Sequence, residues 1–248
     1  METNFIEQLN DPAIGYHKQS KVAHNLEKIL NIAQYVTYGT IIASLICIFS
    51  GESCSISSLV GMRWGPNKRA FGGLFCIVCF LLNYLIPLVY FYIIHAIDVS
   101  SNALKPEYQV SRSMTAFVKW GYIVLGVLNI ICEIEEIGED IALIFFLFLI
   151  AFIIVQVIWA RRLVQKWSNI SSCHKKVAEL LRNYVYLNLG CGIVAIIASE
   201  ISQGAGDFVG YVISGGIDLY LFYLFGTYYR EMVHVYANAN NHNKTTTE

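Results

Sequence analysis

The sequence predicts an all-α integral membrane protein with six transmembrane helices. Of its 248 residues, 56% are hydrophobic and only 14% are charged, whereas a soluble domain carries about a quarter charged residues. The mean hydropathy is +0.51 and the formal net charge is −1. These values exclude a soluble globule, a disordered chain and a nucleic-acid-binding protein with a basic face. We therefore expect the lipid bilayer as a partner of this chain, and no nucleic acid.

Six stretches approach the roughly 20 apolar residues that a helix needs to cross a bilayer. They are Ala33–Ser50, Phe71–Ile97, Ala116–Cys132, Ile141–Ala160, Tyr184–Ser199 and Phe208–Tyr229. Pro87 predicts a kink in the second stretch. The fourth stretch is apolar on every side and is expected to face lipid. Glycines interrupt the third and fifth stretches, which we therefore expect inside the bundle.

The polar ends of the chain flank one membrane domain, which covers residues 33–229. Residues 1–32 are predicted to form a cytoplasmic tail, in which Val22, Leu26 and Ile29 recur at helical spacing opposite lysines. This pattern is typical of a helix on the membrane surface, and equally of an N-terminal extension of the first span. The tail contains no secretory signal pattern. Residues 230–248 are of low complexity and are predicted to be a disordered cytoplasmic tail.

The distribution of basic residues predicts the orientation, because cytoplasmic segments are rich in Lys and Arg. With six spans, 14 of the 17 basic residues fall on the side that carries both termini. The other side receives Arg63, Lys68 and Arg69. Both termini are therefore predicted to be cytoplasmic. The Asn-x-Ser/Thr sequons at Asn169 and Asn243 then lie where they cannot be glycosylated.

The six spans pair into what could be three repeated hairpins. Each outward-going span begins with an aromatic residue followed by valine and ends near Glu52, Glu133 or Glu200. General membrane chemistry places the same residues at the two interfaces, so the repeat remains one of two interpretations. Mitochondrial carriers also consist of three hairpins, but their Pro-x-[Asp/Glu]-x-x-[Lys/Arg] motif is missing here. No family is assigned from the sequence.

Asp218 is the residue on which a functional hypothesis depends, because it lies near the middle of the sixth span. A carboxylate there costs at least about 2.5 kcal/mol and marks a functional site by default. We predict a substrate or ion site at Asp218 with Asn83 and Tyr84 of the second span and Ser214 of its own span. The alternative is a structural role, in which Asp218 holds two helices together by a hydrogen bond.

Small residues precede Asp218 at four-residue steps. Gly206, Gly210 and Ser214 form a stripe of the kind that lets two membrane helices approach closely. The stripe predicts that this face of the sixth span packs against another helix, so that Asp218 faces the bundle.

Acidic residues gather at the predicted outer ends of the spans. They are Glu52, Glu133, Glu136, Asp140, Glu200 and Asp207. Such a cluster could form an electronegative mouth that concentrates cations. The alternative is that these acidic residues lie in solvated loops and have no role beyond the charge distribution that the topology requires.

No catalytic or metal-binding pattern is present in the sequence, so we expect neither a cofactor nor a metal. The six histidines lack metal-ligand spacing, and the pair Cys76-x-x-Cys79 lies inside an apolar helix. Residues 204–207 are similar to the Gly-x-Gly-Asp motif of presenilin-like intramembrane proteases. The other motifs of that family are missing, and no protease is predicted.

Two functions remain after these exclusions. The first is a small transporter or channel for a cation, a proton or a small solute, with Asp218 at the bundle centre. The alternative is a non-enzymatic membrane-organising, trafficking or accessory subunit, acting as a homo-oligomer or within a larger membrane complex. The location is the plasma membrane or an endomembrane, and Tyr229-Arg230-Glu231-Met232 matches a Tyr-x-x-Φ sorting signal for endosomes or lysosomes.

Overall fold

The computed structural model describes residues 9, 12–50, 78–79, 81–134 and 139–246 of the chain. The described residues form helices and no named strand. Five helices are long and apolar enough to cross a membrane. They are Tyr16–Phe49, Leu81–Ala103, Ile144–Trp167, Ser172–Ile201 and Gln203–Asn240. The predicted helical class is confirmed and a membrane protein is supported, whereas the sixth span and the orientation stay predictions.

The first helix, α2 (Pro12–Ser50), is continuous from the N-terminal region into the first apolar stretch. Leu26, Leu30, Ala33 and Thr37 are buried and recur every three or four residues, so one stripe of α2 faces the other helices. The lysines that precede the span lie on the exposed face. The helix of the N-terminal region is therefore an extension of the first span rather than a separate interfacial element.

The second apolar stretch is described from residue 78 and is broken before Pro87. Tyr84 and Leu85 form a turn, and α5 (Ile86–Ala103) begins directly after it. Proline has no N–H to donate and its ring displaces the preceding turn of a helix, which explains why the break predicted at Pro87 lies here. The short 3-10 helix η1 (Pro106–Tyr108) then leads into α6 (Arg112–Ile134).

The C-terminal half contains three further long helical runs. α7 (Glu139–Trp167) and α8 (Ser172–Ile201) are joined by a short turn, where the Ser171 side chain caps α8 by accepting a hydrogen bond from the His174 N–H. α9 (Gln203–Asp207), the π-helix η2 (Phe208–Ile213) and α10 (Ser214–Thr246) then follow one another and return antiparallel to α8.

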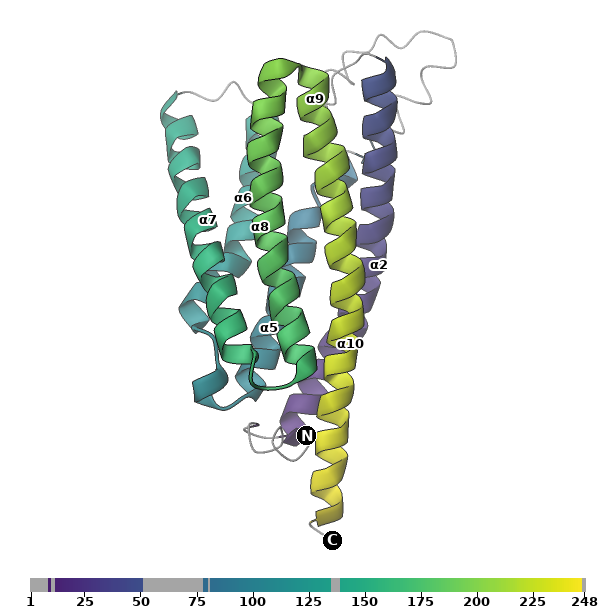
Figure 1. The fold of residues 1–248 in the computed structure, drawn as a ribbon, viewed down its shortest axis with the longest axis vertical. Coiled ribbons are helices and arrows are strands. Elements are labelled where there is room, and N and C mark those ends of the chain that lie inside the picture. The colour runs from purple at the N-terminus through teal and green to yellow at the C-terminus, as the bar shows by residue number, and fades with distance from the viewer. Residues whose placement is uncertain (1–8, 10–11, 51–77, 80, 135–138, 247–248) are drawn as a thin grey trace.

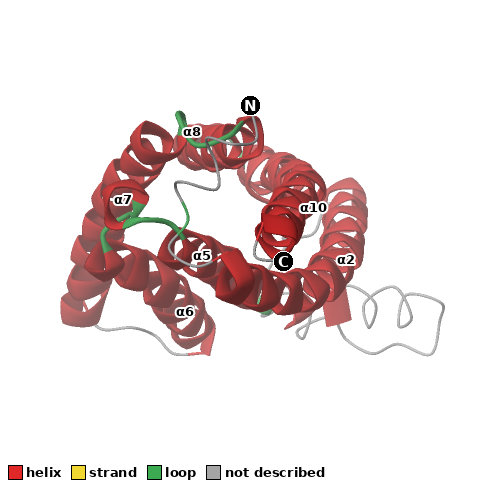
Figure 2. Ribbon diagram, turned by 90° about the horizontal axis from the view of Figure 1, so that it is seen from below, coloured by secondary structure: helices red, strands yellow, loops and turns green. Residues whose placement is uncertain are grey.

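The helices form a ring in chain order. Each long helix packs against the next one along the chain, and α10 packs against α2 to close the ring (Figures 1 and 2). Both termini lie at the same end of this ring as the α5–α6 and α7–α8 connections. Because every helix is part of the wall, α6 and α8 do not occupy the centre that their glycines led us to expect.

The outside of the ring is strongly apolar. Ile144, Phe146 and Leu147 of α7 and Ile196 and Ile197 of α8 each expose more than half of their surface. A water-soluble protein rarely exposes so many large apolar side chains in contiguous positions. This surface is typical of contact with lipid.

The C-terminal segment differs from its prediction, because α10 continues as a helix to Thr246 where the sequence predicts disorder. The reason is a row of apolar side chains that continues beyond the last apolar stretch. Phe225, Tyr229, Met232, Tyr236 and Ala239 are buried and recur at steps of four, three, four and three. That spacing keeps one face of α10 against its neighbours, so tertiary packing overrides the polar composition of the tail.

Candidate functional site

Asp218 lies inside the ring and is held by two tyrosines from two other helices. The Tyr90 hydroxyl of α5 donates to Asp218 Oδ1 at 2.5 Å, and the Tyr184 hydroxyl of α8 donates to the same oxygen at 3.1 Å. Both tyrosine side chains are buried. A distance of 2.5 Å is typical of a hydroxyl bonded to a carboxylate. The carboxylate of α10 is therefore linked directly to α5 and α8.

Three further side chains extend this cluster to α6 and α7. Asn188 Nδ2 donates to the Tyr184 hydroxyl at 3.1 Å, so Tyr184 accepts one hydrogen bond while it donates another. Tyr122 of α6 stacks on Tyr90 with ring centroids 4.8 Å apart, and its hydroxyl accepts a hydrogen bond from Gln156 of α7. We call Asp218, Tyr90, Tyr122, Tyr184, Asn188 and Gln156 the central cluster. It draws polar groups from five helices.

The second carboxylate oxygen of Asp218 is not engaged. Both tyrosines bond to Oδ1, and Oδ2 accepts no hydrogen bond from the part of the chain that the structure describes. As a whole residue, Asp218 is half-buried. We call Oδ2, which has no hydrogen-bond partner among the described residues, the open acceptor of the cluster.

The structure separates Asp218 from the partners that the sequence predicts for it. Asn83 and Tyr84 lie at the break before α5, where both are half-buried, and neither bonds to Asp218. Tyr84 is six residues before Tyr90, which corresponds to about 9 Å along a helix. Ser214 is half-buried at the start of α10, one turn before Asp218.

The close helix contacts near Asp218 differ in part from the predicted stripe. A Cβ added at Gly206 would lie 2.7 Å from the Ser199 side chain of α8, whereas nothing lies within 4 Å of one at Gly210. The close approach of α2 is instead at Gly215, where an added Cβ would lie 2.8 Å from Ile41. A side chain at this position would meet Ile41 closely enough that either the Ile41 side chain or the helix backbone would have to shift.

The predicted acidic mouth is described only in part. Glu133 lies in the last turn of α6, Asp140 in the first turn of α7, Glu200 near the end of α8, and Asp207 at the end of α9. Figure 1 shows these helix ends together, opposite the end that carries both termini. Glu52 and Glu136 lie outside the described residues.

A second polar cluster, which the sequence analysis did not identify, lies toward the end that carries the termini. Ser100 Oγ bonds to Gln19 Oε1 at 3.2 Å, the Tyr236 hydroxyl donates to the Ser100 carbonyl at 3.4 Å, and His174 Nε2 lies 3.2 Å from the Tyr236 hydroxyl. The Tyr229 hydroxyl donates to the Ala96 carbonyl at 3.5 Å. The seven-residue spacing of Tyr229 and Tyr236 in α10 was the available signal.

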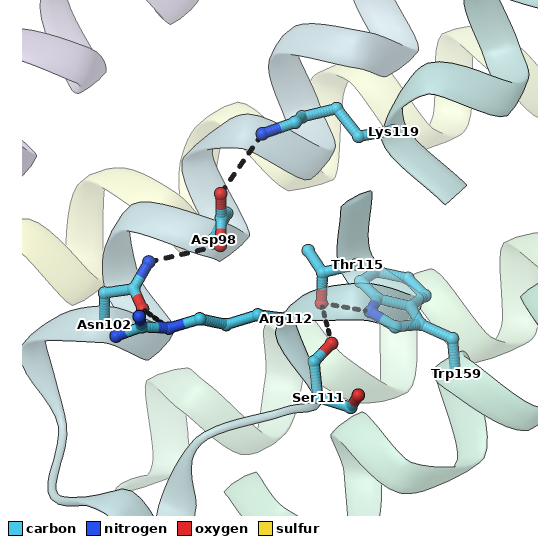
Figure 3. Close-up of polar contacts among 7 residues, drawn as sticks. All are labelled: Asp98, Asn102, Ser111, Arg112, Thr115, Lys119 and Trp159. Atoms are coloured by element: carbon cyan, nitrogen blue, oxygen red, sulfur yellow. Dashed lines mark hydrogen bonds and ion pairs between the residues drawn. The ribbon is translucent and has the colours of Figure 1, made fainter. Parts of the chain in front are cut away.

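An ion pair joins α5 to α6 at the same end of the ring (Figure 3). Lys119 Nζ lies 3.2 Å from Asp98 Oδ2, and Asn102 bridges Asp98 Oδ1 to Arg112 Nε by bonds of 3.1 Å each. Nearby, the Trp159 indole N–H of α7 donates to a threonine hydroxyl of α6 at 3.0 Å. These contacts fix a helix corner and are separate from the central cluster.

The Tyr229-Arg230-Glu231-Met232 sorting signal is not presented to a partner in this structure. Tyr229 and Met232, the two side chains that an adaptor would bind, are 1% and 0% exposed. They face the interior because they belong to the buried row of α10. The motif is therefore explained by packing of the helix.

Among the described residues, no three His, Cys, Asp or Glu side chains lie close enough together to hold a metal ion. Comparisons with known proteins add no functional assignment. No family model matches the chain, and no curated protein and no solved structure shows a significant similarity to it.

Proposed function

We propose that this chain is a small membrane transporter or channel for a cation, a proton or a small solute, and that the translocated species meets Asp218. The observation that carries the proposal is a carboxylate held inside a ring of apolar helices, whose Oδ2 atom accepts no hydrogen bond from the described residues. Placing an acidic group at such a position costs free energy, and such groups are typical of ion and proton pathways. Its two tyrosine donors orient the carboxylate while leaving one oxygen for a ligand.

The proposal includes six spans, with α6 as the sixth, and cytoplasmic termini. Two features support this topology. First, α6 contains the predicted third span and occupies a place in the ring between α5 and α7. Second, the end of the ring that carries both termini also carries the basic connections, as the positive-inside rule expects. The protein then resides in the plasma membrane or an endomembrane.

The test is flux through the purified full-length protein in liposomes. A panel of ions and small solutes is offered to the wild type and to Asp218→Asn, and monodispersity in detergent reports folding for both. We expect Asp218→Asn to abolish flux while the protein remains monodisperse. Flux that is unchanged by the substitution would refute the proposal.

A specific observation also favours the alternative, a membrane-organising or accessory subunit. The Asp218 hydrogen bonds join three helices, so the residue contributes to assembly whatever else it does. In this second role the chain would act as a homo-oligomer or within a larger membrane complex. Wild-type protein without flux, combined with loss of assembly in Asp218→Asn, is the outcome expected of this role.

A further inference from the structure

We infer that the species bound by Asp218 is the proton. The inference rests on the proposed transport function and names its substrate class. It follows from what the central cluster offers to each class of ligand: too few oxygen atoms for a metal cation, too little room for an organic cation, and one open acceptor for a proton.

A metal cation would find few ligands at Asp218. Ca²⁺ and Mg²⁺ require about six or more oxygen ligands at short distances, and a single carboxylate supplies two. The hydroxyls of Tyr90 and Tyr184 both direct their hydrogens toward Oδ1, so they meet the carboxylate as donors. Among the described residues, no three His, Cys, Asp or Glu side chains gather at this site. This site would therefore not replace the water ligands that a metal ion loses when it enters.

An organic cation would find no aromatic cage. Such a cage needs ring faces that surround an open space. In this cluster the Tyr90 ring packs against Tyr122, Tyr184 and Phe222 at centroid distances of 4.8, 5.6 and 5.9 Å. All four rings are buried. The rings therefore contact one another instead of surrounding a cavity, and a ligand of any size would have to separate them.

Protonation adds only one hydrogen atom to the carboxylate, and the open Oδ2 atom can receive it. A hydronium ion transfers its proton to Oδ2 and leaves as water, and the neutral carboxyl group later returns the proton to another water molecule. The titratable groups that face Asp218 are Tyr90 of α5, Tyr122 of α6, and Tyr184 and Cys191 of α8. From α2, Ile41 and Thr37 approach α10 at Gly215, one turn before Asp218, where an added Cβ would lie 2.8 and 3.4 Å from their side chains.

The tyrosine bonds give the two protonation states a common geometry. The Tyr90 and Tyr184 hydroxyls can remain bonded to Oδ1 whether Oδ2 carries a proton or not, so binding and release require no rearrangement of the helices. Removal of one tyrosine hydroxyl changes the balance between the charged carboxylate and the neutral carboxyl group, because the hydrogen bond that is lost is stronger in the charged form. Tyr90 and Tyr184 are thus positioning residues for the carboxylate.

The experiment measures proton flux in liposomes that contain the full-length protein and an entrapped pH-sensitive dye. A potassium gradient with valinomycin sets the membrane potential. We expect the wild type to conduct protons at a rate that is unchanged when external sodium is replaced by an impermeant cation. Asp218→Asn should reduce this flux to that of empty liposomes, and Tyr90→Phe should reduce it about tenfold, since it removes one hydrogen bond to a charged group. Tyr223→Phe is the matched control. Tyr223 lies on α10, the helix of Asp218, and is 66% exposed, so this substitution should leave the flux unchanged.

Parallel uptake of labelled sodium, potassium and tetramethylammonium distinguishes the two levels of the proposal. Asp218-dependent uptake of one of these cations without proton flux would overturn the proton assignment and leave the transport function standing. Wild-type protein that moves none of the four species would overturn both. Proton flux that survives in Asp218→Asn would also overturn the assignment, and Tyr90→Phe decides the case if Asp218→Asn does not fold.

Discussion

The bond between Tyr90 and Asp218 should make a measurable contribution to stability. Hydrogen bonds to charged groups contribute about 1.5–3 kcal/mol in soluble proteins, whereas side-chain bonds within membranes average about 0.6 kcal/mol with a maximum near 1.7. The Tyr90 hydroxyl is buried and lies 2.5 Å from Asp218 Oδ1. We therefore expect a coupling energy of about 1.5 kcal/mol, close to the membrane maximum.

A double-mutant cycle of Tyr90→Phe and Asp218→Ala, followed by reversible unfolding in mixed micelles, measures this coupling, because alanine removes the acceptor oxygen that asparagine would keep. Phenylalanine keeps the ring stacked on Tyr122, so the cycle isolates the hydroxyl. The same cycle with Tyr184→Phe should give a smaller value of about 0.6 kcal/mol, because that bond is 3.1 Å long. The exposed Tyr223→Phe should give no coupling. A Tyr90 coupling no larger than the Tyr223 value would refute the reasoning.

Three other predictions follow from the packing. The Gly215→Ala variant should be less stable than the Gly216→Ala variant by about 1–3 kcal/mol. An added Cβ meets a side chain of α2 at 2.8 Å at Gly215 and nothing within 4 Å at Gly216. Equal thermal stabilities of the two variants in detergent would contradict the α2–α10 contact. Lys119→Gln should cost about 1–2 kcal/mol, because it leaves the largely buried Asp98 without its cation. Lys176→Gln breaks a half-exposed ion pair and should cost less than Lys119→Gln; chemical unfolding compares the two. Epitope tags at both termini should be reached by antibody only after permeabilisation, and labelling of either one in intact cells would disprove the orientation.

The sequence predicts the helices well because membrane spans are set by composition and length. Where the chain is described, the apolar stretches lie within helices except at the turn of Tyr84 and Leu85, which directly precedes Pro87, the residue from which a kink was predicted. The packing of the helices against one another was harder to predict from the sequence, because glycines do not specify which neighbour a helix meets. The contact that brings α2 against α10 uses Gly215, one residue beyond the predicted stripe. A one-residue step turns a helix by about 100°, so the predicted face was displaced.

Asp218 itself could be found from the sequence, because a carboxylate in an apolar span is rare. Its partners could not. Tyr90, Tyr122 and Tyr184 are three of 16 tyrosines, and tyrosines are also common at membrane interfaces, so nothing in the sequence separates them. Only the ring arrangement brings residues of five helices to the same level. The same is true of the buried row from Tyr229 to Tyr236 in α10, whose residues beyond Tyr229 were assigned to a disordered tail from composition alone.

The central claim is that the Asp218 carboxyl group, inside the ring, exchanges protons with water. Infrared difference spectroscopy of the reconstituted full-length protein tests it directly, by comparing the wild type with Asp218→Asn as the pH is lowered. We expect the wild type to show an additional carboxyl C=O band on acidification that moves to lower frequency in D₂O and is missing in Asp218→Asn. Identical difference spectra for the two proteins would contradict the claim, because Asp218 would then be sealed from water and would act only in packing.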